Sequence, residues 1–504
     1  SVNSMPKENK MGTMPVKKLI FNMALPLIIS MLIQALYNIV DSIFVSRISE
    51  DALTAVSLAF PIQNLMIAFA TGTGVGMNAL LSRRLGEKNR EAAEEVANVG
   101  LLLSICTAVV FALFGVFGSQ LYFSMQKGVS PIIAEYGAQY LSIVCIGSIG
   151  IFVEITAERM LQGTGQTLIT MFIQGIGAII NIILDPIMIF GLLGCPAMGV
   201  RGAAYATIIG QLVAAVLGIV LNQKHNTDVR VNLKKIRFNF PLIGEIYSIG
   251  FPSILMTAIG SVTTYLMNQI LLAFSTTASA VYGVYFKLNS FFFMPLFGLN
   301  NAVVPIVAYN YGARNRGRIH QAIRTSTITA VTIMLLGWAA FFFLPVPLLR
   351  LFDASEAMIA IGIPAFRITS FTYPLAAVSI VASSVFQALG KSIYSMLVSL
   401  GRQLIVLIPV AYLFSLTGVL DDVWLAFPIA EVVCLISSLF FLKKVPTGWM
   451  TSRSNIYGFL ALDEFSSHKA PQIPPYLCIF SLLSKILSVF LCAFVSFLVL
   501  TAAN

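Results

Sequence analysis

Long apolar stretches alternate with short polar segments along this chain from residue 19 onward. Most apolar stretches run for about 20 residues or more, enough for each to cross a bilayer as a helix. We therefore predict twelve membrane spans, joined by short polar connections. Their predicted ranges are 19–46, 54–82, 95–119, 132–161, 168–192, 200–223, 243–273, 277–309, 320–344, 358–388, 394–416 and 423–442.

Residues of the first six spans recur in the last six at a nearly constant spacing. Six spans return the chain to the side where it began, so two such halves are parallel repeats about an axis along the membrane normal. The fold class that we predict is an all-α polytopic membrane protein of two parallel six-helix lobes. The recurring pairs are Pro26 and Pro252, Gly86 and Gly312, Asn89 and Asn315, Arg90 and Arg316, Gln162 and Gln387, and Gly165 and Gly390.

The polar segments divide the chain into five parts. We predict a cytoplasmic N-terminus over 1–18, a first lobe over 19–223, a basic cytoplasmic linker over 224–242, a second lobe over 243–442 and a tail over 443–504. The tail holds a further apolar segment, 473–503, which contains Lys485 and has no counterpart in the first half. We assign this segment no function.

Charge supports a membrane protein and orients it. Of the 504 residues, 58% are hydrophobic and only 10% are charged, whereas soluble domains carry about 25% charged residues. Most Lys and Arg fall on the side of the N-terminus, which the positive-inside rule places in the cytoplasm. We expect the membrane to be the cell (inner) membrane of a bacterium or archaeon. The opposite loops hold only Arg47, Lys127, Arg201 and Arg350.

The distribution of charge also limits the kinds of partner that we expect. The net charge of +10 comes largely from loops that can lie against anionic lipid, so we expect a lipid partner and no nucleic acid. The six cysteines and three histidines form no cluster with metal-ligand spacing. No histidine falls in the interior of a span, and no HExxH or GxSxG motif occurs. We therefore expect neither an enzyme nor a cofactor.

Two aspartates lie within predicted spans, where an ionisable group is costly and usually functional. Asp41 is in the first span and Asp185 in the fifth, both in the half away from the N-terminus. Asn181 is four residues before Asp185 and shares its helix face. Pro186 removes a backbone donor and frees a carbonyl one turn earlier. Two carboxylates at similar depth suit a proton or Na⁺ site.

The acid pair is not repeated in the second half. By the spacing of the repeat, Asp41 corresponds to Met267 and Asp185 to Val410. We therefore predict that ion coupling belongs to the first lobe alone.

Other charged residues within spans have structural explanations. Lys287 and Glu431 lie at matching depths in spans 8 and 12, which predicts a buried ion pair of mainly structural importance. Glu154, Glu158 and Arg159 lie near the inner end of span 4. For these three we predict pairing at the membrane interface.

Several motifs in residues 15–445 resemble the multidrug and toxic compound extrusion (MATE) family, most closely its MepA-like and DinF-like bacterial branches. The fifth-span motif is the most specific, and the glycine turns are shared more loosely. The motifs are Ala24-Leu25-Pro26, Val40-Asp41-Ser42-Ile43-Phe44-Val45, Arg83-Arg84-Leu85-Gly86, Asn181-Ile-Ile-Leu-Asp185-Pro186 and Gly202-Ala-Ala-Tyr-Ala-Thr207. The tail departs from the family's twelve-helix plan.

This resemblance implies an antiporter that exports cationic, amphipathic small molecules in exchange for H⁺, which we prefer, or Na⁺, by alternating access between the lobes. It implies a cation-coupling site of four residues in the first lobe: Asp41, Asn181, Asp185 and Thr207. Na⁺, if used, would bind at Asp41, Asn181 and Asp185. We expect a monomer whose substrate cavity is lined by Tyr37, Asn38, Tyr140, Met256 and Tyr265.

Two other transporter classes stay open at this point. A flippase for a lipid-linked saccharide belongs to the same superfamily, but it should carry more cations in its cavity than Lys287 and Arg367. A major facilitator would also have parallel repeats, yet the turn after the second span lacks the acidic-basic signature of that group.

Overall fold

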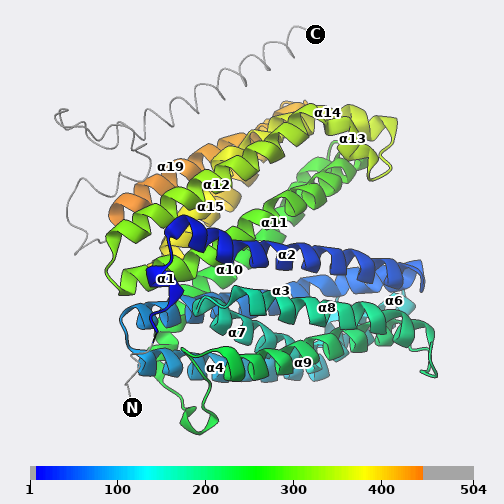
Figure 1. Cartoon of the computed structure of the whole chain (residues 1–504). Coiled ribbons are helices and arrows are strands. Elements are labelled where there is room, and N and C mark those ends of the chain that lie inside the picture. The colour runs from blue at the N-terminus through cyan, green and yellow to red at the C-terminus, as the bar shows by residue number, and fades with distance from the viewer. Residues whose placement is uncertain (1–6, 446–504) are drawn as a thin grey trace, which may run out of the picture. The chain divides into compact units, whose positions relative to one another are not determined.

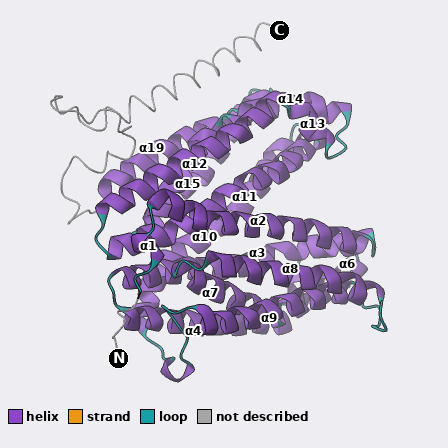
Figure 2. Ribbon diagram, in the orientation of Figure 1, coloured by secondary structure: helices purple, strands orange, loops and turns teal. Residues whose placement is uncertain are grey.

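The computed structural model describes residues 7–445, and this part of the chain is helical throughout, without strands (Figures 1 and 2). Ten helices in it are long and apolar enough to cross a membrane, and two bent helix pairs raise the number to twelve if each pair is one span. The predicted segment 473–503 lies outside the described residues.

The first half of the chain supplies six spans and begins with the short helix α1 (Lys10–Thr13). The pair α6 and α7 is bent by 46°, and the short helix α5 (Ser119–Ser124) precedes it. The spans are α2 (Val16–Ser46), α3 (Glu50–Gly86), α4 (Arg90–Phe117), α6 (Pro131–Ile146) with α7 (Ile149–Gly163), α8 (Thr167–Phe190) and α9 (Val200–His225).

The second half follows the 3₁₀ turn η1 (Leu233–Lys235) and includes the short helix α13 (Pro345–Arg350). Its bent pair, α14 and α15, turns by 44°. The spans are α10 (Phe240–Leu272), α11 (Thr276–Gly312), α12 (Arg316–Phe343), α14 (Glu356–Ser370) with α15 (Thr372–Ala388), α16 (Ser392–Leu400) with the π-helix η2 (Gly401–Leu407) and α17 (Ile408–Ser415), and α18 (Leu420–Trp424) with α19 (Ala426–Lys444). Every predicted span agrees with a helix or helix group to within a few residues.

The repeat is visible in local geometry as well as in sequence. Asn89 caps α4 by accepting a hydrogen bond from the Ala92 N–H, and Asn315 caps α12 in the same way. Such side-chain caps satisfy N–H groups that have no partner within the helix. The preceding turns are also equivalent, because Lys88 and Arg314 both take a positive φ, 60° and 54°.

The repeated glycines Gly86 and Gly312 allow two helices to pack closely. Gly86 and Gly312 are the last residues of α3 and α11. A Cβ on Gly86 would meet the carbonyl oxygen of Tyr309, and one on Gly312 would meet that of Arg83. The two helix ends therefore pack backbone against backbone, which only glycine permits.

The described chain forms two compact units that do not coincide with the sequence halves. The first comprises Ser1–Val262, Phe297–Arg314 and Phe386–Met396. The second comprises Thr263–Leu296, Asn315–Val385 and the described residues from Leu397 onward. The first unit thus extends beyond the predicted lobe 19–223, because segments of α10 and α11 pack closely against the glycines of α3.

The core of the first unit surrounds the bent pair α6 and α7. Phe111 of α4 contacts Phe69 of α3 and Phe152 of α7, with ring centroids 5.9 and 5.7 Å apart. Tyr140 of α6 belongs to the same buried cluster and is 3% exposed. Because packed interiors leave little freedom to side chains, this cluster holds the Tyr140 phenol in place within the unit.

Candidate functional site

Helix α8 presents the central residues of the site on its buried face. Asn181 is 3% exposed and Asp185 is fully buried. Their spacing of four residues stacks them one turn apart, and Pro186 follows within the same helix. Apolar residues such as Ile179 and Ile183 occupy the exposed face of α8. Because α8 is amphipathic, the side chains of Asn181 and Asp185 point toward the interior of the protein.

Helices α2, α6 and α9 supply the other residues that the sequence singled out. The Asn181 Nδ2 donates to the hydroxyl of Tyr37 on α2 over 2.8 Å. The Thr207 hydroxyl of α9 lies in hydrogen-bonding contact with Tyr37 and with Tyr140 of α6. Thr207 also donates to the carbonyl of Ala203 one turn earlier, at 2.9 Å. Four helices thus converge on one polar cluster.

The carboxyl groups of Asp41 and Asp185 lie near each other and interact electrostatically. The Asp41 Oδ1 and both carboxylate oxygens of Asp185 receive no hydrogen bond from a fixed donor within the described chain. No Lys, Arg or His there forms an ion pair with either group. Asp185 is fully buried and Asp41 is half-buried, and two such carboxylates without a cation are costly unless a proton or a metal ion neutralises part of their charge.

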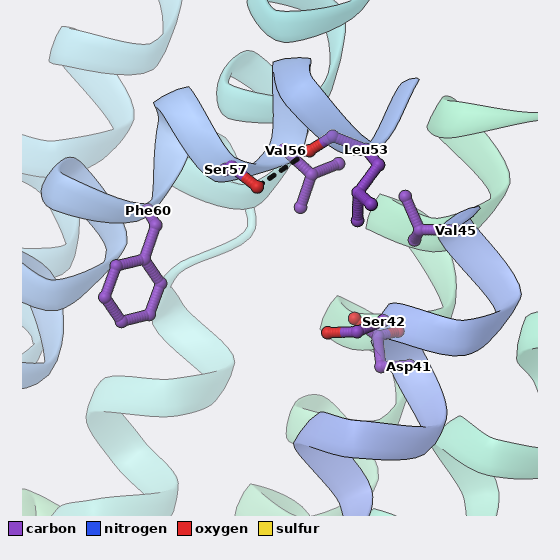
Figure 3. Close-up of a pocket in the computed structure, with 7 residues that line it drawn as sticks. All are labelled: Asp41, Ser42, Val45, Leu53, Val56, Ser57 and Phe60. Atoms are coloured by element: carbon purple, nitrogen blue, oxygen red, sulfur yellow. Dashed lines mark hydrogen bonds between the residues drawn. The ribbon is translucent and has the colours of Figure 1, made fainter. Parts of the chain in front are cut away.

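A pocket of about 260 Å³ opens beside Asp41 (Figure 3). Three of its lining residues come from α2 and four from α3. Figure 3 shows Ser57 bonded to the carbonyl of Leu53 and the ring of Phe60 at the far side from Asp41. The pocket is smaller than the roughly 300–1,000 Å³ typical of drug-sized sites. Its lining is Asp41, Ser42, Val45, Leu53, Val56, Ser57 and Phe60.

The remaining predicted cavity residues are not part of this cluster. Asn38 is exposed, although it is next to Tyr37 in sequence. Met256 lies in the first unit without a recorded contact to the cluster, and Tyr265 belongs to the second unit and is 63% exposed. Gln63 of α3 was not predicted, yet its Nε2 donates to the Tyr140 hydroxyl over 3.2 Å. Its position as a polar glutamine within an apolar span could have identified it from the sequence.

The predicted ion pair between Lys287 and Glu431 is wrong. Glu431 instead pairs with Arg402, whose Nη1 lies 3.6 Å from the Glu431 Oε2. Lys287 is exposed, and its ammonium lies 6.0 Å from the ring centroid of Phe352. Arg402 lies in the π-helix η2, within the predicted span 394–416.

The interfacial pairing predicted for Glu154, Glu158 and Arg159 is also wrong. Glu158 is only 4% exposed, and within residues 7–445 neither glutamate forms an ion pair. The Arg159 guanidinium instead donates to the side-chain oxygens of Gln162 and Asn301, both at 3.3 Å. Glu158 is therefore buried within the first unit, whereas Glu154 and Arg159 are half-buried.

The described helices, with ten to twelve apolar spans and a buried carboxyl pair, define a polytopic membrane transporter of two lobes. A family model described as MatE matches the chain twice, over residues 26–187 and 251–413. The two matches fall in the two halves of the repeat. This chain belongs to the MatE family, and the predicted family and fold class are confirmed.

Relatives and solved structures agree with this assignment. The multidrug export protein MepA of Staphylococcus aureus (strain MRSA252) is 27% identical over 436 residues, which cover 84% of this chain and 93% of MepA. A structure titled as the outward-facing conformation of a multidrug resistance MATE family transporter of the MOP superfamily has a TM-score of 0.81 and 26% identity, over 88% of this chain and 98% of that one. A MOP superfamily transporter from Pyrococcus furiosus, whose title reports a binding pocket of reverse polarity and suggests a different function, has a TM-score of 0.80 and 27% identity with the same coverage.

Proposed function

We propose that this protein is a secondary antiporter that exports cationic, amphipathic compounds in exchange for H⁺. The observation that carries the proposal is the buried pair Asp41 and Asp185, held among hydroxyl and amide groups without a cation from the described protein. The multidrug export named for the MepA relatives supports the export of drug-like compounds.

The carboxyl pair explains how an ion and a cationic compound can exclude each other. Without a proton, the pair carries negative charge that attracts a cation. With a proton on Asp41 or Asp185, that attraction is lost and the cation is released. Na⁺ could also use these oxygens together with the Asn181 Oδ1, which has no donor. We favour H⁺ because two neighbouring carboxyl groups without a cation are neutralised most simply when one of them holds a proton.

The pocket beside Asp41 supports access for a small ion rather than binding of a whole drug. Its volume of about 260 Å³ lies below the range of drug-sized sites, roughly 300–1,000 Å³. We infer that protons reach Asp41 through this pocket, while the compound lies mostly outside the pocket and only its cationic group is attracted to the carboxyl pair. The hydrogen bond between Tyr37 and Asn181 ties α2 to α8, so a change of charge at the pair is transmitted to the packing of both helices.

Basic connections at one end of the first unit support a cytoplasmic N-terminus. Arg84 pairs with Glu245 at 3.3 Å and Arg90 pairs with Asp228 at 3.0 Å. These pairs join the connection after α3 to the linker and to the start of α10. By the positive-inside rule, we place this end, which we call the basic end, in the cytoplasm.

Efflux from proteoliposomes tests the proposal. A cationic dye would be loaded, and its efflux measured under an imposed pH gradient or an imposed Na⁺ gradient. We expect the pH gradient alone to drive efflux, and Asp41→Asn and Asp185→Asn each to abolish it. Asp51→Asn, which removes an exposed carboxylate in the first turn of α3, should retain full efflux. Full gradient-driven efflux in either site variant would refute the assignment, and efflux driven only by Na⁺ would refute the choice of proton.

A further inference from the structure

A second pair of carboxyl groups lies inside the first unit, apart from Asp41 and Asp185. Glu154 and Glu158 are one turn apart on α7, so their carboxyl groups are neighbours on one helix face. Gln174 of α8 donates its Nε2 to the Glu158 Oε2 over 2.9 Å. The Glu158 Oε1 is buried and receives no hydrogen bond within the described residues.

One base, Arg159, acts electrostatically on Glu158, but no ion pair to Glu154 or Glu158 forms within residues 7–445. Arg159 is adjacent on α7, but its guanidinium is bonded to Gln162 and Asn301. The helices packed against α7 are α3, α4, α8 and α9, with part of α11 near Arg159. Their ionisable residues are Glu50, Asp51, Arg83 and Arg84 of α3, Arg90, Glu91, Glu94, Glu95 and Cys106 of α4, Asp185 of α8, Arg201, Tyr205, Lys224 and His225 of α9, and Tyr309 and Tyr311 of α11.

Most of these residues lie near helix ends, and none is recorded as an ion-pair partner of Glu154 or Glu158 within residues 7–445. Two neighbouring carboxylates repel each other, and an acceptor oxygen without a donor is costly when buried. A single proton removes both costs, since it lowers the negative charge and supplies the missing donor. The geometry therefore favours a pair that holds one proton.

The buried face of α8 connects the two carboxyl pairs. Gln174, Asn181 and Asp185 lie along this face, and the span from Gln174 to Asp185 rises by about 16 Å at 1.5 Å per residue. Gly177 lies between them and has no side chain. A Cβ there would be 3.8 Å from the Glu154 Oε1, so the Glu154 carboxyl lies beside α8 about one turn from Asn181.

The second pair is also nearer the basic end of the unit. Glu158 is five residues from the C-terminal end of α7 at Gly163, and α8 begins close to that end at Thr167. Asp185 is five residues from the other end of α8, at Phe190. The Thr170 hydroxyl of α8 donates to the backbone carbonyl of Glu158 over 3.4 Å. Glu158 thus lies between the first carboxyl pair and the connection that joins α7 to α8.

We propose that Glu154 and Glu158 form a second proton-binding site, through which the proton taken up at Asp41 and Asp185 leaves toward the basic end. A carboxylic acid of the first pair gives up its proton, and a carboxylate of the second pair takes it up. The second pair then gives the proton to water at the basic end, forming hydronium. Only O–H bonds break and form, and no oxidant or other reactant is needed. This inference rests on the proposed proton antiport and adds its route through the lobe.

Proton-coupled efflux in proteoliposomes tests the route, with Glu154→Gln and Glu158→Gln in the full chain. The pH on the basic side is varied while the pH on the other side is held constant. We expect Glu158→Gln to lower efflux by at least about tenfold, a conservative value for a lost proton-transfer group, and to flatten its dependence on basic-side pH. Binding of the dye in detergent should stay unchanged, because the first pair is intact. Glu158→Asp, which keeps a carboxyl group, should restore part of the pH dependence.

Two controls make the outcome decisive. Glu91→Gln removes an exposed carboxylate at the start of α4 and should leave the pH profile unchanged. Infrared difference spectra should show a protonated carboxyl band that Glu158→Gln removes and Glu91→Gln keeps. A wild-type pH profile in both Glu154→Gln and Glu158→Gln, with dye binding retained, would overturn the second site. A different result would refute the proposed proton antiport itself, namely full gradient-driven efflux in Asp185→Asn.

Discussion

Removing only Arg402 should destabilise the second unit more than removing both Arg402 and Glu431. The two charges are 3.6 Å apart, and the Glu431 side chain is 8% exposed. At an effective dielectric constant of about 20, this distance corresponds to roughly 5 kcal/mol of attraction. Much of that attraction is offset by the cost of burying both groups. Arg402→Met leaves the Glu431 carboxylate buried without its cation, and we expect a loss of about 3–5 kcal/mol.

Thermal unfolding of the purified protein measures this effect. If residues 7–445 unfold together, an unfolding entropy of about 2.1 cal/mol/K per residue converts the loss into a fall of about 3–5 °C in Tm. The double variant Arg402→Met with Glu431→Leu should recover most of that fall, because no charge is then left buried alone. Size-exclusion chromatography after heating, with fluorescence detection, reports the fraction that stays folded.

The variant Lys287→Met tests whether Glu431 pairs with Arg402, as the structure shows, or with Lys287, as the depths of the residues predicted. Lys287 is exposed, so its loss should change stability by less than about 0.5 kcal/mol. The pairing deduced from the structure would be refuted if Lys287→Met were as destabilising as Arg402→Met, or if the double variant lost as much stability as the two single variants combined.

Three further predictions follow from single contacts in the first unit. Gly250→Ala places a Cβ 2.7 Å from a backbone carbonyl oxygen of α3. This overpacking should lower the free energy of unfolding by about 1–3 kcal/mol. The control Gly244→Ala, with open space around it, should leave the Tm unchanged. Tyr37→Phe removes the acceptor of the buried Asn181 amide and should cost about 1–3 kcal/mol, measured as a lower Tm with expression retained. Ser57→Cys, in a background without other cysteines, should react with a charged thiol reagent and slow efflux because Ser57 lines the pocket; an unreactive thiol would show that the pocket is closed to water.

Span positions and the identity of the first acid pair could be predicted from sequence because both depend on local properties. A run of apolar residues is costly to leave in water wherever it folds, so hydropathy located all twelve spans within a few residues. Asp41 and Asp185 were found because a charged side chain within such a run is costly too. The repeat of Asn89 as Asn315 indicated two equivalent turns, which the structure confirms as helix caps.

Partners of the buried charges were decided only by tertiary structure. Depth along a span says how far a residue lies from the membrane surface, but it does not say which way the side chain points around the helix axis. Lys287 and Glu431 match in depth, but their side chains face different surroundings. Arg402 lies in the π-helix η2, which changes the direction of side chains around the helix axis relative to an α-helix. Glu158 likewise lies near a span end, yet it points inward to Gln174. That direction is set by how neighbouring helices pack, through contacts between residues far apart in sequence that no local pattern records.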